Sequence, residues 1–239
     1  ERYDKIFVMK TIHILIISVS LFLCSLVIAA GLGNVTKPQR SVTVRGLSER
    51  EVPADMAVWR LSFSVGGNEL PGLRKNIIEQ TEIVKDFLKN HGLTDSDFSV
   101  LAPEITDTSV ELYIDSSRKN YVYIAKQNVL IRSSKVNEVK KASEDTLELL
   151  GKGISVRSDY DTKVNYEFNG LNQIKPEMIA DATENARAAA EQFAHDSHSK
   201  VGKITSASQG FFSINDAATG LEELKRVRVV TTVVYALAD

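Results

Sequence analysis

The clearest structural signal in the sequence is a run of alternating polar and apolar residues, AVWRLSFSV, at residues 57–65. Trp59, Leu61 and Phe63 fall on one face of an extended chain and polar residues fall on the other, which is the period-two pattern of a half-buried β-strand. A shorter alternation, SVTVRG, precedes it at residues 41–46. Two strands are therefore predicted in this region.

An acid-rich patch from Glu49 to Asp55 separates the two predicted strands. Glu49, Glu51 and Asp55, with Arg50 among them, could in principle supply a general acid and a general base. A catalytic carboxylate needs partial burial, however, and this patch lies between two strands and contains Pro53. We therefore interpret it as a solvated turn or bulge that joins the strands.

Amphipathic helices are predicted where apolar residues recur every three or four positions. The predicted helices are residues 70–88 with a stop at Gly92, residues 136–150 with a stop at Gly151, and an alanine-rich helix at 176–198 with Pro176 in its first turn. The apolar stripe expected on the third helix is Met178, Ala182, Ala186, Ala189 and Phe193.

Further strands are predicted in pairs separated by short turns, which favours antiparallel pairing. The segments are residues 98–112 and 120–132 joined by the turn DSSRKN, then residues 153–158 and 161–170, and finally residues 203–214 and 226–237. This order predicts an α+β fold, with mixed, largely antiparallel sheets, amphipathic helices packed on them, and an N-terminal transmembrane helix in front.

The expected transmembrane helix is the apolar segment IHILIISVSLFLCSLVIAA at residues 12–30. A helix of this length can cross a hydrocarbon core of about 30 Å. The segment is longer than the apolar part of an ordinary signal peptide, which favours an uncleaved anchor, and cleavage after Ala29 is the alternative. The expected divisions of the chain are a short segment at 1–11, the anchor or long signal sequence at 12–33, a linker at 34–40 and a folded domain at 41–239.

The residues before the apolar segment indicate its orientation. Lys10 precedes it and the leading segment is short, so the simplest topology exports the folded domain from the cytoplasm. Met9 is typical of a natural start, which would make residues 1–8 an upstream extension. Cys24 is the only cysteine and lies inside the apolar segment, so the predicted domain uses neither a disulfide nor a thiolate nucleophile.

Composition and motifs argue against nucleic-acid binding and against the common nucleotide-binding motifs. The net charge is −2 and the basic residues are scattered, so there is no electrostatic footprint for a nucleic acid. The sequence also contains no G-x-G-x-x-G motif and no P-loop. We expect no nucleic-acid partner and no cofactor.

The strongest candidate for a metal or catalytic site is AHDSHSK, where His195 and His198 stand three residues apart beside Asp196. On a helix this spacing places both histidines on one face, where they can hold a metal. Two ligands are too few, and histidine is favoured at a helix C-terminus by the dipole. His91 is likewise expected at a helix end beside Gly92. We predict no catalytic, cofactor-binding or metal-binding residue.

Trp59 is the only tryptophan in the chain. It shares a strand face with other apolar residues, whereas ligand-stacking surfaces usually gather several aromatic rings. We therefore expect its ring to pack in the core, against the helix that follows, instead of offering a surface to a ligand.

Taken in order, these motifs resemble the SIMPL-domain family of bacterial envelope proteins. The resemblance begins with the V-x-V-x-G strand, the acid-containing turn with its Ala54–Asp55 step and the long alternating strand. It continues through ENARAAAEQFAHDSHSKVGKITSASQG and RVRVVTTVVYAL, and covers residues 40–237. The resemblance implies a periplasmic or membrane-anchored protein. Some members of the family form rings or channel-like oligomers, and some are linked to oxidative stress. It carries over no reaction and no catalytic residue.

The leading hypothesis is a protein that is not an enzyme, is anchored in the bacterial inner membrane by one span, and acts through self-association with its domain in the periplasm. The expected partners are the membrane, through residues 12–30, and further copies of the chain. Envelope or oxidative-stress tolerance is the expected setting. The alternative is a periplasmic hydrolase or metal-dependent enzyme that uses His195 and His198.

Overall fold

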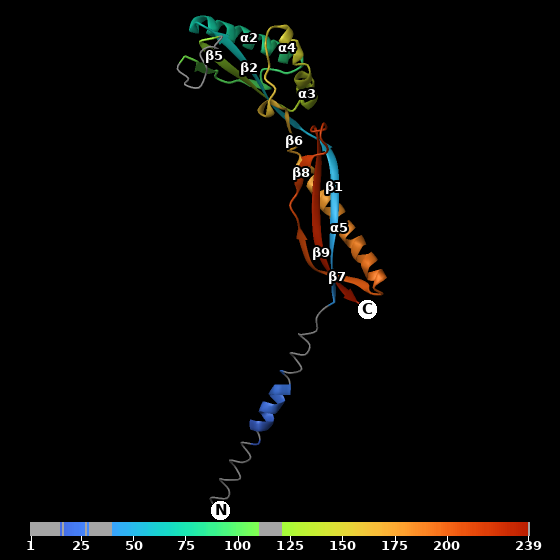
Figure 1. Cartoon of the computed structure of the whole chain (residues 1–239). Helices are drawn as coiled ribbons and strands as arrows, with labels where there is room; N and C mark the ends of the chain where they lie inside the picture. Colours follow the sequence, from blue (N-terminus) through green and yellow to red (C-terminus); the bar gives the residue numbers. More distant parts are fainter. Residues whose placement is uncertain (1–14, 16, 27, 29–39, 110–120, 239) are drawn as a thin grey trace, which may run out of the picture. The chain divides into compact units, whose positions relative to one another are not determined.

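The structure is a computed structural model that describes residues 15, 17–26, 28, 40–109 and 121–238 (Figure 1). Its elements, in chain order, are β1 Ser41–Pro53, β2 Met56–Gly67, α2 Leu70–Asn90, β3 Phe98–Val100, β4 Glu104–Asp107, β5 Tyr123–Ser133, α3 Val136–Glu144, α4 Leu147–Gly151, the 3-10 helix η2 Tyr160–Thr162, β6 Asn165–Glu167, α5 Leu171–Asp196, β7 Lys200–Gln209, β8 Ser213–Asp216 and β9 Leu224–Ala238. Helices packed with antiparallel sheets confirm the predicted α+β class.

The first sheet has five strands in the order β3-β5-β2-β6, with β4 also paired to β5. Its long central pair joins β2 and β5 in antiparallel register, with Trp59 opposite Ile131 and Phe63 opposite Gln127. Because side chains alternate between the two faces of a strand, the odd-numbered residues of β2 and β5 point to the same side. That side forms a core with residues of α2, α3 and α4, and Figure 1 shows these helices beside β2 and β5.

Helix α2 forms where it was predicted, and its end is fixed by Gly92. The backbone N–H of Gly92 donates to Lys89 O at 3.0 Å and that of Leu93 donates to Leu88 O at 3.2 Å. Gly92 has a φ of 85°. This is the glycine-closed motif in which a residue in the left-handed conformation satisfies the last carbonyls of a helix. The predicted stop at Gly92 is therefore confirmed.

The second sheet has the order β1-β9-β7, with β8 also paired to β9. Helix α5 packs on it through a small core that contains Val52, Met178, Ala182, Val227 and Val229. At Gly46 the two elements are in backbone contact, because a Cβ placed there would lie 1.8 Å from Ala182 O. Alanine on α5 and glycine on β1 thus permit an approach that larger side chains would prevent.

Contacts between Cα atoms divide the described chain into two compact units. One contains residues 45–187 and 208–232, and the other contains residues 188–207, 233–238 and the described residues before 45. The first sheet, its helices and the packing of Gly46 on α5 all belong to the first unit.

Two helix predictions are corrected. The predicted helix at 136–150 is divided into α3 and α4. The predicted stop, Gly151, is the last residue of α4, and the helix is closed by Gly153, which has a left-handed φ of 79°. Helix α5 begins at Leu171, so Pro176 lies within it. The earlier start is explained by Leu171 and Ile174, whose side chains pack on the second core.

The apolar stripe of α5 is also different from the predicted one. Ala190 and Ala194 are buried, whereas Phe193 is 54% exposed. The buried residues therefore follow a strict four-residue spacing, which keeps one row of small side chains on the helix face. The buried row is Met178, Ala182, Ala186, Ala190 and Ala194.

Most predicted strand segments contain strands, but the predicted strands at 98–112 and 203–214 are each divided in two, into β3 and β4 and into β7 and β8. β3 and β4 pair with β5 as expected, while the predicted turn DSSRKN lies outside the described residues. The predicted pair at 153–158 and 161–170 is wrong. Val156 makes only an isolated bridge to Phe63, and β6 pairs with β2. Both segments therefore line the edge of β2 and do not pair with each other.

The expected membrane anchor is described only in part. Residues 15, 17–26 and 28 are helical with exposed side chains, and residues 12–14, 16, 27 and 29–33 lie outside the described residues. Among the described residues, no helix combines the length and the apolar character that a membrane span requires.

Candidate functional site

The acid-rich patch is the first sequence candidate, and most of it lies on a strand. Because β1 continues to Pro53, only Ala54 and Asp55 separate it from β2, and the predicted turn over residues 49–53 is wrong. Glu49 and Glu51 point to one face of β1, where Glu51 Oε1 accepts a hydrogen bond from Arg226 Nη2 at 3.0 Å. Arg226 Nε also lies 3.4 Å from Glu49 Oε1. The two carboxylates are thus paired across strands.

The other face of β1 directs Arg50 toward α5. Its guanidinium donates to Glu177 Oε2 at 2.8 Å and to Asp181 Oδ2 at 3.3 Å. The hydrogen bond that Arg50 donates to Glu177 is the main cause that raises the pKa of Arg50. Exposed ion pairs of this kind contribute little stability individually, and here they join β1 to the helix.

Asp55 occupies the short connection and has a structural role. Its carboxylate accepts hydrogen bonds from Asn169 N at 2.9 Å, from Asn169 Nδ2 at 2.9 Å and from Gly170 N at 2.8 Å. These donors lie directly before Leu171, the first residue of α5. A carboxylate at a helix N-terminus satisfies free N–H groups and interacts favourably with the helix dipole. The patch therefore fixes β1 and α5, and we find no pair of free carboxylates in it.

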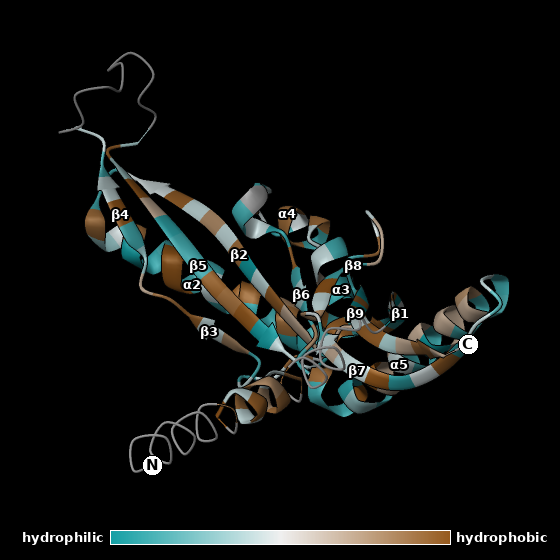
Figure 2. Ribbon diagram, turned by 90° about the horizontal axis from the view of Figure 1, so that it is seen from below, coloured by the Kyte–Doolittle hydropathy of each residue, from teal (hydrophilic) through white to brown (hydrophobic). Residues whose placement is uncertain are grey.

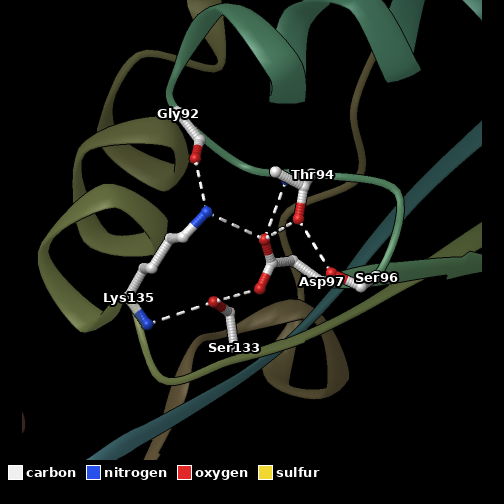
Figure 3. A network of polar contacts seen from close by, with 6 residues as sticks. All are labelled: Gly92, Thr94, Ser96, Asp97, Ser133 and Lys135. Carbon is white, nitrogen blue, oxygen red and sulfur yellow. Dashed lines mark hydrogen bonds and ion pairs between the residues drawn. The ribbon is translucent and has the colours of Figure 1, made fainter.

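The most strongly perturbed carboxylate of the described residues is Asp97, in the connection between α2 and β3 (Figure 3). Thr94 donates to it through its backbone N–H at 2.8 Å and its hydroxyl at 2.7 Å, and Ser133 donates through its hydroxyl at 2.7 Å. Lys135 Nζ lies 3.2 Å away and also donates to Gly92 O.

This network accounts for the electrostatics of Asp97. Burial by itself would raise the pKa of the carboxyl group, but the hydrogen bonds from Thr94, Ser133 and Lys135 outweigh burial and hold it far below its usual range. Figure 3 shows these donors converging on the carboxylate from the loop after α2, from the end of β5 and from Lys135, which directly precedes α3. Because the acceptor sites are taken by protein donors, Asp97 is a structural anchor between the loop and the sheet.

The histidines predicted as an alternative metal pair do not share a helix face. Helix α5 ends at Asp196, and His198 has a φ of 56° in the turn that follows. Ser199 N donates to Ala194 O at 2.8 Å and His198 N donates to His195 O at 3.1 Å, the bonds that close a helix. His195 is 85% exposed and contacts Asp196 at 3.3 Å. Hydrogen bonds from Gln192 and His195 lower the pKa of Asp196.

The described part of the chain does contain a metal-compatible group elsewhere, formed by His91, Asp145 and Glu148. One ligand atom from each lies within 4.8 Å of the other two. His91 caps α2 as predicted, with Nδ1 2.9 Å from Phe87 O and Nε2 3.2 Å from Asp145 Oδ2. Both ring nitrogens therefore already have protein oxygens within hydrogen-bonding distance.

A polar cavity of about 410 Å³ lies beside Trp59. The indole is 3% exposed and its Nε1 donates to Thr162 O at 3.0 Å, which confirms the predicted burial of the ring. Tyr166 also lines this cavity. Burial raises the pKa of the Tyr166 phenol to about 12, and the carboxylates of Glu223 and Glu144 add to the effect. The phenol is therefore neutral near pH 7 and is no general base.

A second hollow is an apolar groove of about 600 Å³, which we call the α2 groove. One wall is formed by α2 between Leu70 and Glu82 and the other by the chain from Val100 to Ile105. Figure 2 shows apolar segments on both elements. The sequence did not predict this groove. Ile78 gives a signal, because it is a large apolar residue outside the apolar stripe that the spacing predicts for this helix, Leu70, Leu73, Ile77, Val84 and Leu88.

The longest exposed strand in the C-terminal part of the described chain is β7. It lies at one end of the strand order of the second sheet, and nine of its ten residues are exposed. Ile204 is 51% exposed. An edge strand with uncovered side chains can pair with another strand, because its outer N–H and C=O groups have no partner within the sheet.

The comparisons with known proteins bear on the fold, not on a reaction. A family model described as "SIMPL: Protein of unknown function (DUF541)" matches residues 42–235. No curated protein matches the chain. The matched range begins in β1 and ends in β9, so it includes both sheets and every helix from α2 to α5. The chain therefore belongs to the SIMPL family.

Proposed function

We propose that this protein is not an enzyme and acts through self-association, as an extracytoplasmic domain held to a membrane by residues 12–33. The observation that carries the proposal is β7, an exposed strand at the edge of the second sheet. A second copy is the proposed partner, because pairing of identical edges around a two-fold axis forms a closed dimer.

The composition of β7 supports this role. Proteins that remain monomeric usually protect their edge strands with charged residues, proline or bulges. The stretch Ile204–Ala207, in contrast, is ITSA and contains neither a charge nor a proline. Lys200 and Lys203 precede it, so the charges are confined to the start of the strand. The end of β7 is therefore the part that we expect to pair.

The carboxylates and histidines of the described residues give less support to catalysis. Glu49, Glu51, Asp55 and Asp97 are all engaged by protein donors. The alternative of a metal-dependent enzyme with His195 and His198 as ligands lacks the shared helix face on which it depended. Self-association needs none of these groups.

The setting that we propose is the bacterial envelope, with a role in envelope or oxidative-stress tolerance. The apolar segment at residues 12–30 supports attachment to a membrane, since its length suits the hydrocarbon core. The resemblance to envelope proteins supports the periplasmic location and the stress role. Both are tested by locating the full chain in fractionated cells and by comparing peroxide survival with and without it.

Cysteine crosslinking tests the proposed pairing. In a chain with Cys24→Ser, single Thr205→Cys or Ser206→Cys substitutions are expected to give a disulfide-linked dimer under mild oxidation. A disulfide requires Cα atoms about 4.4–6.8 Å apart, a distance that paired strands provide. Leu147→Cys on α4, where Leu147 is 77% exposed, is the matched control and is expected to stay monomeric. Equal crosslinking at Leu147→Cys and β7, or none on β7, would contradict pairing.

A further inference from the structure

We propose that the α2 groove binds a long aliphatic chain with a carboxylate head group, that is, a free fatty acid. This inference is independent of self-association, because β7 contributes no residue to the groove. It rests on the shape of the groove, on the engagement of the Thr81 and Gln127 side-chain donors in its walls, and on Arg74, a lining cation that has no ion pair among the described residues.

The walls of the groove are long and apolar. Leu70, Ile77 and Ile78 line it from α2, and Leu101 and Ile105 line it from the opposite segment. Ile78 is 50% exposed and Ile105 is 53% exposed. A volume of about 600 Å³ lies within the range of about 300–1,000 Å³ that is usual for small-molecule sites. Covering such aliphatic side chains gains about 25 cal/mol per Å² of apolar surface removed from water.

The polar groups in the walls favour an aliphatic ligand over a peptide. The Thr81 hydroxyl donates to Ile77 O at 2.7 Å. The Gln127 amide donates to Leu101 O at 2.6 Å and also to Asn128 O. These side-chain donors are therefore already engaged. A buried peptide would bring backbone groups that need partners, whereas an alkyl chain needs none.

The head group is assigned from the charges that line the groove. Glu82 Oε1 is paired with Lys85 at 2.7 Å. Arg74 lines the groove and, among the described residues, has neither an ion pair nor a side-chain hydrogen bond. It stands one helical turn from both Leu70 and Ile78, so all three side chains lie on the same side of α2. A guanidinium binds a carboxylate with two parallel hydrogen bonds.

Photo-crosslinking of the full chain tests the inference. The chain is placed in phosphatidylcholine nanodiscs and irradiated with a diazirine-bearing palmitate, and labelled peptides are identified by mass spectrometry. We expect label on residues 70–82 and 100–105. Unlabelled palmitate should compete with the diazirine probe about tenfold better than hexadecyltrimethylammonium does. The cationic head group of the latter cannot form the charge-assisted hydrogen bonds with Arg74 that a carboxylate forms.

Two pairs of variants separate the groove from general apolar binding. Arg74→Gln should weaken labelling about tenfold, whereas Lys75→Gln, a neighbouring cation outside the groove, should leave it unchanged. Ile78→Gln should weaken it about fivefold, whereas Leu147→Gln should not. Label without enrichment in the groove, or equal effects within either pair, would overturn the inference. The inference would also be overturned if the wild-type groove were not labelled and Ile78→Gln formed a smaller oligomer than the wild type, because a second copy of the chain would then occupy the groove.

Discussion

Gly46→Ala is the most direct perturbation of the contact between β1 and α5. The added Cβ would lie 1.8 Å from Ala182 O and 2.5 Å from Ala186 N. Both atoms belong to the helix backbone, so no side chain can rotate away, and the strand must move off the helix by about 1 Å or more to restore normal contact distances. The movement loosens the small core around Val52.

The expected loss of stability follows from two opposing terms. Forcing an extra carbon into a packed contact costs about 1–3 kcal/mol, and replacing glycine by alanine recovers about 0.4–1 kcal/mol by restricting the unfolded chain. Because the contact is with backbone atoms that cannot rotate away, we expect a cost near the top of the first range, and therefore a net loss in the free energy of unfolding of about 2 kcal/mol. For a domain of this size that lowers Tm by about 4–8 °C.

Thermal unfolding followed by circular dichroism measures the effect, on a chain of residues 34–239. Gly72→Ala is the matched control. A Cβ at Gly72 meets nothing within 4 Å, and alanine favours a helix over glycine by about 1 kcal/mol, so this variant should melt about 2–4 °C higher than the wild type. If Gly46→Ala melts at or above the wild-type temperature, β1 does not pack on α5 as described.

Three further predictions concern single residues. Trp59→Ala should lower the free energy of unfolding by about 3–5 kcal/mol. Fluorescence of the wild-type indole should be blue-shifted and weakly quenched by iodide, and a red-shifted, freely quenched signal would place the ring on the surface. Asp97→Asn should cost about 1.5–3 kcal/mol at pH 7. The folded-state pKa of Asp97 lies below its unfolded value, so the carboxylate stabilises the fold above about pH 4 and this stabilisation is lost at lower pH. The difference in free energy of unfolding between wild type and Asp97→Asn, measured with urea, should therefore become smaller below about pH 4. A difference that does not change with pH would refute the role of the hydrogen-bond network. Elemental analysis should find no stoichiometric metal, and a metal that is lost in His198→Ala would favour the enzyme alternative over ours.

The parts of the fold that the sequence predicted well are those governed by one period. The alternation around Trp59 identified β2, and the three- and four-residue spacing with Gly92 identified α2. These signals are local, because one face of each element is buried against the core. The resemblance to the SIMPL family is confirmed by the family match over residues 42–235.

The errors arise where a distant partner decides the local structure. Glu49 and Glu51 suggested a turn, but Arg226 on β9 pairs with them and the strand continues. Pro176 suggested a helix start, but apolar contacts of Leu171 extend α5 by a further turn. Neither partner can be recognised from spacing along the chain, which explains why propensity alone failed.

The candidate sites were harder to predict for the same reason. His91 and Asp145 are far apart in the sequence and meet only because α2 and α4 pack on the same sheet. The α2 groove combines a helix with an edge segment about twenty residues later, and only the exposed apolar residue Ile78, outside the predicted apolar stripe of the helix, hinted at it.

The oligomeric mass of the folded part tests the central claim most directly. All described buried apolar residues lie between Val42 and Ala236, so a chain of residues 34–239 retains the complete core. Light scattering over a range of concentrations should give at least twice the monomer mass. Ile204→Lys should lower it toward the monomer, because a charge on β7 opposes pairing, and Leu147→Lys should not. A strictly monomeric wild type at every concentration would contradict the proposal that this protein acts through self-association.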